Sequence, residues 1–217
     1  MESEIGIKSK GKIIGSGITI FIALSIVTIS VLKCASPKMA YEPKNLAYLP
    51  MVLSEKTIEN QPITIDYLLA YQGKIGPDSS LWYFKVIRDK TWYLFTFNKD
   101  KKSELNLLFA DKRLNSALLL FENNKPDLGY ATLTKAEKYL ESAVPYSTDN
   151  TDFVKKLALA SLKHREVIEN KILPLAPEDV RPNVIRVNDY SKEVYKKTRD
   201  ILQSKGLTAP VNIFDMR

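Results

Sequence analysis

Cysteine and histidine are almost missing from this sequence of 217 residues, which has one of each. A single cysteine, Cys34, cannot form a disulfide within the chain, and a single histidine, His164, leaves too few soft ligands for a structural zinc site. We therefore predict no metal site, and we expect the stability of the fold to come from packing.

Glycine is also scarce, and none of the eight glycines belongs to a phosphate-binding loop or a dinucleotide fingerprint. No segment of any length alternates polar and apolar residues with the period of a strand, and no internal repeat is evident. We therefore predict no cofactor and an all-α fold.

Charge of one sign exceeds the other only modestly, with 32 basic residues against 25 acidic residues and a net charge of +7. The two signs alternate along most of the chain, as in residues 135–138, which is typical of solvated helix faces. We predict no nucleic-acid partner. An anionic lipid surface or a cell-wall polymer is the alternative partner for these basic residues.

One long apolar run is present. Residues 13–32 contain no charge in 20 positions, and a helix of that length spans about 30 Å, the thickness of a bilayer hydrocarbon core. We predict a transmembrane helix over 13–32, with the lipid bilayer as its partner. A buried helix of a soluble core is the alternative.

The orientation of this helix follows from its place in the chain. Three lysines on each side leave the charge count undecided, but a short basic tail before a first apolar run is typical of a signal anchor. We predict a single-pass protein of the cytoplasmic membrane, with residues 1–12 inside and the C-terminal domain outside. Lys33 and Pro37 leave no clean cleavage site, and Lys33 argues against lipidation of Cys34.

Residues 33–80 read as a proline-containing tether and loop, because Pro37, Pro43, Pro50 and Pro62 interrupt any helix. Within this segment, residues 67–80 are expected to be extended or turning. A short helix over 65–71 is the alternative.

The rest of the chain has helical periodicity. We predict helices over 81–97, from Asn98 as N-cap to about 121, over 126–144, from 149 or 151 to just before Pro174, and over 188–204 with Gly206 as a left-handed C-cap. A connection of a few residues makes the second and third helices an antiparallel hairpin. The expected organisation is a helical hairpin domain over 81–145, helices packed on it over 146–206, and a tail over 207–217. A hairpin with a loosely attached tail is the alternative to a bundle.

Two aromatic pairs, Trp82-Tyr83 and Trp92-Tyr93, lie ten residues apart on the first of these helices. They share the face of Phe84 and Phe95 only in part. Core packing is the main interpretation for the four rings, and part of their surface is expected to face a membrane interface or a partner. The charged triplet Arg88-Asp89-Lys90 is expected at the rim of this helix. For Arg88, Lys112 and Arg113 we favour stems laid over apolar neighbours and pairs with acids such as Asp89 and Asp111. The possible interaction surface is Trp82, Tyr83, Arg88, Trp92, Tyr93 and Arg113.

No arrangement of residues indicates catalysis. The only histidine, His164, lies in a Lys-His-Arg cluster and reads as a helix-face residue. Glu137 and Glu141, like Glu178 and Asp179, are carboxylate pairs of the kind that helix surfaces routinely carry. We predict no catalytic residues.

Three sequence segments form a recognisable pattern: Pro-Asp-Ser-Ser-Leu-Trp from Pro77, with the later Lys85 and Arg88, the lysine-rich start after Phe97, and Ala-Asp-Lys-Arg-Leu from Ala110. Together they resemble a bacterial family of domains of unknown function that follow a single membrane helix. The resemblance covers residues 66–145, with Ser80 and Lys99 at positions where the family often has proline. It implies an exported helical hairpin of no established activity. Some relatives resemble the outer parts of anti-sigma regulators, but a tail of 12 residues is too short for a sigma-binding domain.

The function predicted from the sequence is a membrane-tethered helical interaction or scaffold module of the bacterial envelope. Its partner is expected to be an envelope protein or a cell-wall polymer. A sensor or ligand-binding domain that signals through a single-pass anchor is one alternative, and a cell-wall-acting enzyme is another. The sequence leaves the oligomeric state open.

Overall fold

The computed structural model describes residues 65–145 and 149–216. The predicted cytoplasmic tail, transmembrane helix and most of the tether lie outside these residues. Within them every regular element is helical and none is a strand, which confirms the all-α prediction for this part of the chain. None of the helices described combines the length and the apolar character that a bilayer crossing requires.

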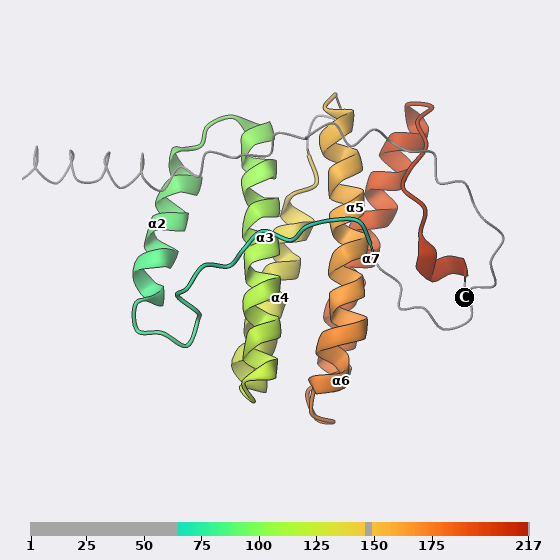
Figure 1. Ribbon diagram of the computed structural model, residues 1–217. Helices are drawn as coiled ribbons and strands as arrows, with labels where there is room; N and C mark the ends of the chain where they lie inside the picture. The colour runs from blue at the N-terminus through green and yellow to red at the C-terminus, as the bar shows by residue number, and fades with distance from the viewer. Residues whose placement is uncertain (1–64, 146–148, 217) are drawn as a thin grey trace, which may run out of the picture. The chain divides into compact units, whose positions relative to one another are not determined.

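The helices follow one another with short connections. They are α2 (Trp82–Phe95), α3 (Lys99–Glu122), α4 (Pro126–Ser142), α5 (Thr151–Val167), a π-helical turn η1 (Ile168–Ile172), α6 (Leu173–Leu175), α7 (Arg181–Ser204) and a 3-10 turn η2 (Ile213–Met216) (Figure 1).

Local chemistry places several of these ends where the sequence predicted them. The Asn98 side chain accepts hydrogen bonds from the backbone N–H groups of Asp100 and Lys101, so it is the N-cap of α3. Gly206 has φ +70°, and Leu207 N–H donates to the Leu202 carbonyl, which closes a left-handed C-cap after α7.

The helix after Asn150 does not end before Pro174, as the sequence had suggested. It passes through the π-helical turn η1, and Pro174 then lies inside the last short turn, α6. A proline ring clashes with the carbonyl four residues earlier in a regular helix, so a widened turn at that point lets the chain continue. Pro182 likewise belongs to the first turn of α7, which begins at Arg181 and not at residue 188.

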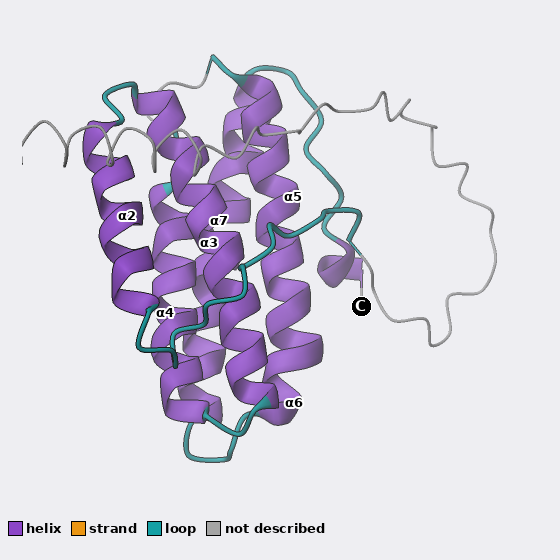
Figure 2. Ribbon diagram, turned by 60° about the vertical axis from the view of Figure 1, so that its left-hand side comes forward, coloured by secondary structure: helices purple, strands orange, loops and turns teal. Residues whose placement is uncertain are grey.

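Four long helices form the bundle. The antiparallel hairpin α3–α4 packs against the pair α5 and α7, with α4 beside α7 and α3 beside α5 (Figure 2). Fully buried aliphatic side chains from all four fill the centre: Leu114, Leu133, Leu140, Leu157, Ile168, Val184 and Leu202. Burying one such side chain contributes about 2 kcal/mol, so this centre is the main source of stability.

Two irregular segments lie across the bundle. Residues 65–72, here called the strap, run over α3 and α5 with Ile65 and Ala70 buried (Figure 1). The segment predicted as a tail returns along α5 and α7 instead, where Tyr195 donates a hydrogen bond to the Pro210 carbonyl at 2.6 Å and Arg165 lies 4.1 Å from the Phe214 ring.

Candidate functional site

Helix α2 turns an apolar face outward. The exposed fractions are 75% for Tyr83, 72% for Phe84, 61% for Ile87, 68% for Leu94 and 62% for Phe95. Spacings of three, four and seven residues put these side chains on one side of the helix. They are called the outer stripe below. A monomeric protein rarely leaves so many large apolar side chains together in water, so the stripe is the strongest candidate for a binding surface.

The inward face of α2 is polar at its centre. Asp89 is the one buried residue of the helix, and its carboxylate accepts hydrogen bonds from Arg88 at 2.7 and 3.1 Å. The negative charge of Asp89 also favours the protonated forms of Lys85, Lys112 and Arg113. The sequence had placed Asp89 at the rim of the helix. That was wrong, because Asp89 is the acid around which this basic cluster gathers.

Burial perturbs the cations around Asp89. Desolvation lowers the pKa of Lys85 to about 8, although the charge of Asp89 opposes this shift. Desolvation also lowers the pKa values of Lys112 and Arg113. Lys85 lies 4.6 Å from the Trp82 ring and donates to the Gln72 and Ile75 carbonyls, so α2 is joined to the end of the strap.

Apolar contact between α2 and the bundle is limited. The Trp92 ring meets Phe109 of α3 edge-on, with centroids 6.3 Å apart. Beside this contact, an open apolar cleft of about 440 Å³ runs along the edge of α2, lined by Phe109 and Tyr139 on the bundle side and by Leu94 at the margin of the outer stripe. Helix α2 therefore lies at the edge of the bundle (Figure 2), with few apolar contacts to it.

The residues predicted as an interaction surface do not lie together: five belong to different sides of α2, and Arg113 belongs to α3. Tyr83 lies in the outer stripe, Tyr93 is about one third exposed (37%), and Trp82 and Arg88 are half-buried. Trp92 packs on Phe109, and Arg113 is buried against the Tyr139 ring at 4.4 Å. Phe84, Ile87, Leu94 and Phe95 were not in the predicted surface.

His164 is the centre of a buried polar cluster. It was interpreted as a helix-face residue, but its exposure is 0%, and its two ring nitrogens contact Glu137 of α4 at 2.7 Å and Asp111 of α3 at 3.1 Å. Burial lowers the pKa of His164, but attraction to Glu137 and hydrogen bonds to Asp111 and Glu137 outweigh burial and raise the pKa to about 9. At neutral pH the imidazolium therefore bridges two carboxylates.

The same cluster holds the strap. The second oxygen of Asp111 accepts hydrogen bonds from the Tyr67 hydroxyl at 2.9 Å and the Ala70 N–H at 3.2 Å. At the strap's beginning, Glu166 accepts from the Ile65 N–H at 2.7 Å and from Lys163 at 2.9 Å. Buried charges on α3 and α5 thus fix the segment through which the chain enters the bundle.

Glu137 was grouped with Glu141 as a surface carboxylate pair. Glu137 is instead fully buried, and its Oε2 has no hydrogen-bond partner among the residues described. Glu141 is exposed, with its carboxylate 3.7 Å from the Lys197 amine. Because only Glu141 reaches the solvent, the two carboxylates cannot both contact a cell-wall polymer in the way that a hydrolytic pair would have to. In the part of the chain that the structure describes, no three His, Cys, Asp or Glu side chains are grouped to hold a metal ion.

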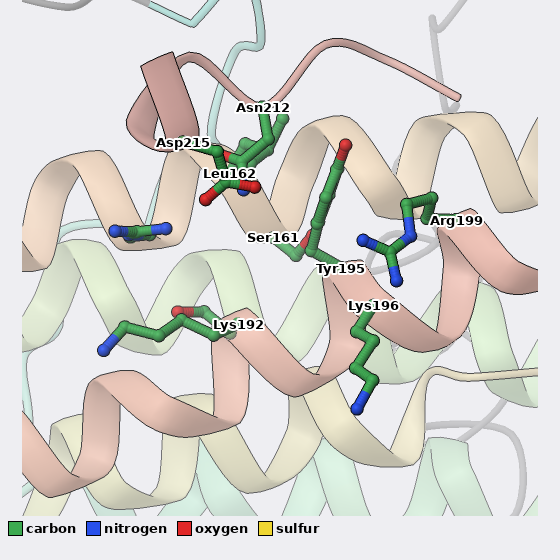
Figure 3. A pocket seen from close by; sticks show the side chains of 10 residues that line it. Ser161, Leu162, Lys192, Tyr195, Lys196, Arg199, Asn212 and Asp215 are labelled. Carbon is green, nitrogen blue, oxygen red and sulfur yellow. The ribbon is translucent and has the colours of Figure 1, made fainter. Parts of the chain in front are cut away.

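A polar cleft of about 200 Å³ lies between α5, α7 and the returning C-terminal segment (Figure 3). Arg165, Lys192, Lys196 and Arg199 contribute cationic groups to its lining, and Asp215 contributes an acid. Arg165 pairs with Glu169, Lys192 with Asp189 and Arg199 with Asp200, so most of this charge is neutralised locally.

The buried cluster has a signal in the sequence that the prediction did not use. Asp111, Glu137 and His164 each occupy a position on the apolar stripe of their helix: Asp111 follows Leu107 by four residues, Glu137 follows Leu133 by four, and His164 follows Ala160 by four. Opposite charges on the inner faces of three helices could have indicated a shared buried site.

Comparison with known proteins gives one family and no individual relative. No curated protein and no solved structure matches the chain. The family match begins in the loop before α2 and ends with α6, so it includes the outer stripe, Asp89 and the His164 cluster. It extends about 30 residues beyond the end of the region in which the sequence itself had suggested a family. Residues 74–175 of this chain match the model of DUF5667, a family of domains of unknown function.

Proposed function

We propose that this chain is a membrane-tethered interaction module of the bacterial envelope. In this proposal residues 13–32 anchor it in the cytoplasmic membrane with the N-terminus inside, and the helical domain works outside by binding rather than by catalysis. Support for the anchor comes from the 20 uncharged residues of this run and its basic flanks.

A single observation carries the binding part of the proposal: the outer stripe of α2 exposes five large apolar side chains, while the same helix buries an aspartate. Such a helix is poorly explained as a contributor to the core, because its apolar side gains nothing from the fold. A partner that covers the stripe removes this surface from water and supplies the missing stabilisation.

The anchor and its orientation are tested by fractionation and proteolysis. We expect the full chain to stay with membranes after an alkaline wash, and we expect protease added to intact, wall-stripped cells to digest the C-terminal domain. Recovery of the uncleaved chain from the soluble fraction without detergent would refute the anchor, and protection of the domain inside the cell would refute the orientation.

The binding face is tested with a photo-crosslinking amino acid at Phe84. The matched control has the same amino acid at Tyr71, which is 66% exposed on the strap. Adducts to one partner, protein or lipid, are expected at position 84 and not at position 71. Equal labelling at both positions would mean that the stripe is ordinary surface.

The polar cleft in Figure 3 favours a second candidate, a sensor for a small anion. Its volume of about 200 Å³ is below the roughly 300 Å³ at which ligand pockets usually begin, so only a small solute fits. Binding of phosphate or a small dicarboxylate, measured by calorimetry and abolished by Lys196→Ala with Arg199→Ala, supports this candidate. Absence of binding at millimolar concentrations removes it.

A further inference from the structure

We propose that the partner of the outer stripe is the surface of a lipid bilayer with anionic headgroups, so that α2 lies in the interface of the membrane that anchors the chain. This inference rests on the proposed function and names the partner of the same face.

The chemistry of the stripe suits an interface. Helix α2 has 14 residues and is therefore about 21 Å long, too short to cross a bilayer but long enough to lie in its headgroup region. Tyr83 has an aromatic ring with a polar hydroxyl, a side chain favoured at the boundary between headgroups and acyl chains, and Phe84 and Phe95 supply the apolar rings typical of the buried face of an interfacial helix.

The charges beside the stripe are mostly basic. Lys90 lies seven residues from Tyr83 and four from Leu94, so it borders the stripe on the same side of the helix. Phe97, which is exposed, leads into the exposed residues Lys99, Asp100 and Lys101 at the start of α3. The acid of α2, Asp89, is turned inward and paired. Each lysine near an anionic surface contributes about 1 kcal/mol of attraction.

A second copy of the chain fits the stripe less well. In a symmetric dimer the same surface of each copy faces the other, so the exposed residues Lys90, Lys99 and Lys101 would meet their own equivalents, and like charges placed opposite one another destabilise an interface. A bilayer with anionic headgroups attracts these lysines instead, and a weak contact is enough because the anchor already holds the domain at the membrane.

The chain length between anchor and bundle permits this contact. Residues 33–64 separate the apolar run from the beginning of the strap, and 32 residues reach at most about 110 Å. The strap then leads directly to α2 through the hydrogen bonds of Lys85. The helix nearest in sequence to the anchor is therefore the one with the apolar outer face.

The test uses the full chain, with Cys34→Ser, reconstituted in vesicles. A single cysteine is introduced at Phe84 on the stripe or at Glu193, an exposed position on α7, and carries an environment-sensitive fluorophore. Vesicles of phosphatidylcholine, with or without about one third phosphatidylglycerol, contain acyl chains brominated to quench a fluorophore that enters the bilayer. Only vesicles that keep the protein after an alkaline wash are measured, so failure of the anchor is recognised separately.

In anionic vesicles we expect quenching at position 84 to be at least about twofold stronger than at position 193. We expect it to weaken in vesicles of phosphatidylcholine alone, and also when Lys90→Glu and Lys101→Glu are combined. Equal quenching at positions 84 and 193 would overturn the proposal. A fluorophore at 84 that is shielded from water but not quenched, and is cross-linked to a second copy, would overturn it in favour of a dimer.

The label itself could disturb α2. The label-free variant Ile87→Asp with Phe95→Asp changes two exposed side chains, so helix content by circular dichroism should not change. Its domain should lose protection of α2 by the bilayer in hydrogen exchange. Unchanged protection with an intact helix would also overturn the proposal.

Discussion

His164 shows how one residue changes its meaning when the fold is known. In the sequence it stands between lysine and arginine, which suggested a solvated helix face. In the bundle those neighbours point to the rim, while the imidazole lies between Asp111 and Glu137. Asp111, Glu137 and His164 are far apart in the sequence, so no local sequence pattern indicates that their side chains are in contact.

The raised pKa of His164 predicts a dependence of stability on pH. The pKa is about 9 in the folded protein, against 6.5 for an unperturbed histidine, so the contribution is complete below pH 6.5 and is lost as the pH rises to about 9. For residues 58–217 we expect a loss on the order of 3 kcal/mol over this window. The lowered pKa of Lys85 acts in the opposite sense above about pH 8.

Comparison with His164→Gln separates these contributions, because Lys85 is common to both proteins. Urea unfolding at pH 6, 7.5 and 9 should give a difference between the two proteins that shrinks as the pH rises. A difference that stays constant with pH would show that His164 is not charged in the folded protein.

The buried position of Asp89 predicts that its carboxylate helps to hold α2 against the bundle. Asp89→Asn leaves Lys85, Arg88 and Arg113 without their buried acid, so α2 should open more often while the bundle stays intact. Hydrogen exchange should show at least about tenfold faster exchange in α2 and little change in α3. The matched variant Asp179→Asn, at an exposed position, should change neither helix, and equal effects of both variants would contradict this role.

At the scale of the helix, the approach of α3 to α4 depends on Gly129. A Cβ at this position would lie 2.9 Å from the Phe121 ring. Although alanine favours a helix by about 1 kcal/mol over glycine, Gly129→Ala should destabilise the domain by about 1–3 kcal/mol because Phe121 must move. Thermal unfolding measures the effect. The exposed neighbour provides the control, since Ala131→Gly should cost about 1 kcal/mol by propensity alone.

The outer stripe makes a prediction about which apolar residues support the fold. Ile87→Ala should change the free energy of unfolding by no more than about 0.5 kcal/mol, because Ile87 is 61% exposed. The same substitution at Ile172, which is fully buried, should cost about 2–5 kcal/mol. Similar losses in urea unfolding for the two variants would show that α2 is part of the core.

Helix ends were predictable where one residue decides them, as at Asn98 and Gly206. They were mispredicted where tertiary packing overrides a local signal. Pro174 normally ends a helix, yet the preceding π-helical turn carries the chain past it. The spacing of the apolar residues of α2 indicates a stripe, but it does not indicate whether the stripe faces the bundle or the solvent. That orientation depends on the burial of Asp89 beside basic residues of α2 and α3, and those of α3 are distant from it in the sequence.

For the whole molecule, periodicity predicted the helical hairpin and the all-α class of the described residues because short connections leave few ways to pack amphipathic helices. It did not predict the candidate site, because an outward apolar face and a buried charge cluster both contradict the usual distribution of residues. Such exceptions are where function is expected.

The central claim is that the outer stripe of α2 is covered when the protein is in its own membrane. Hydroxyl-radical footprinting of the full chain in native membranes tests this directly by comparing the oxidation of Tyr83 and Tyr71, which are 75% and 66% exposed in the domain alone. We predict that Tyr83 is oxidised several-fold more slowly than Tyr71. Equal oxidation of the two tyrosines in the membrane would contradict the account.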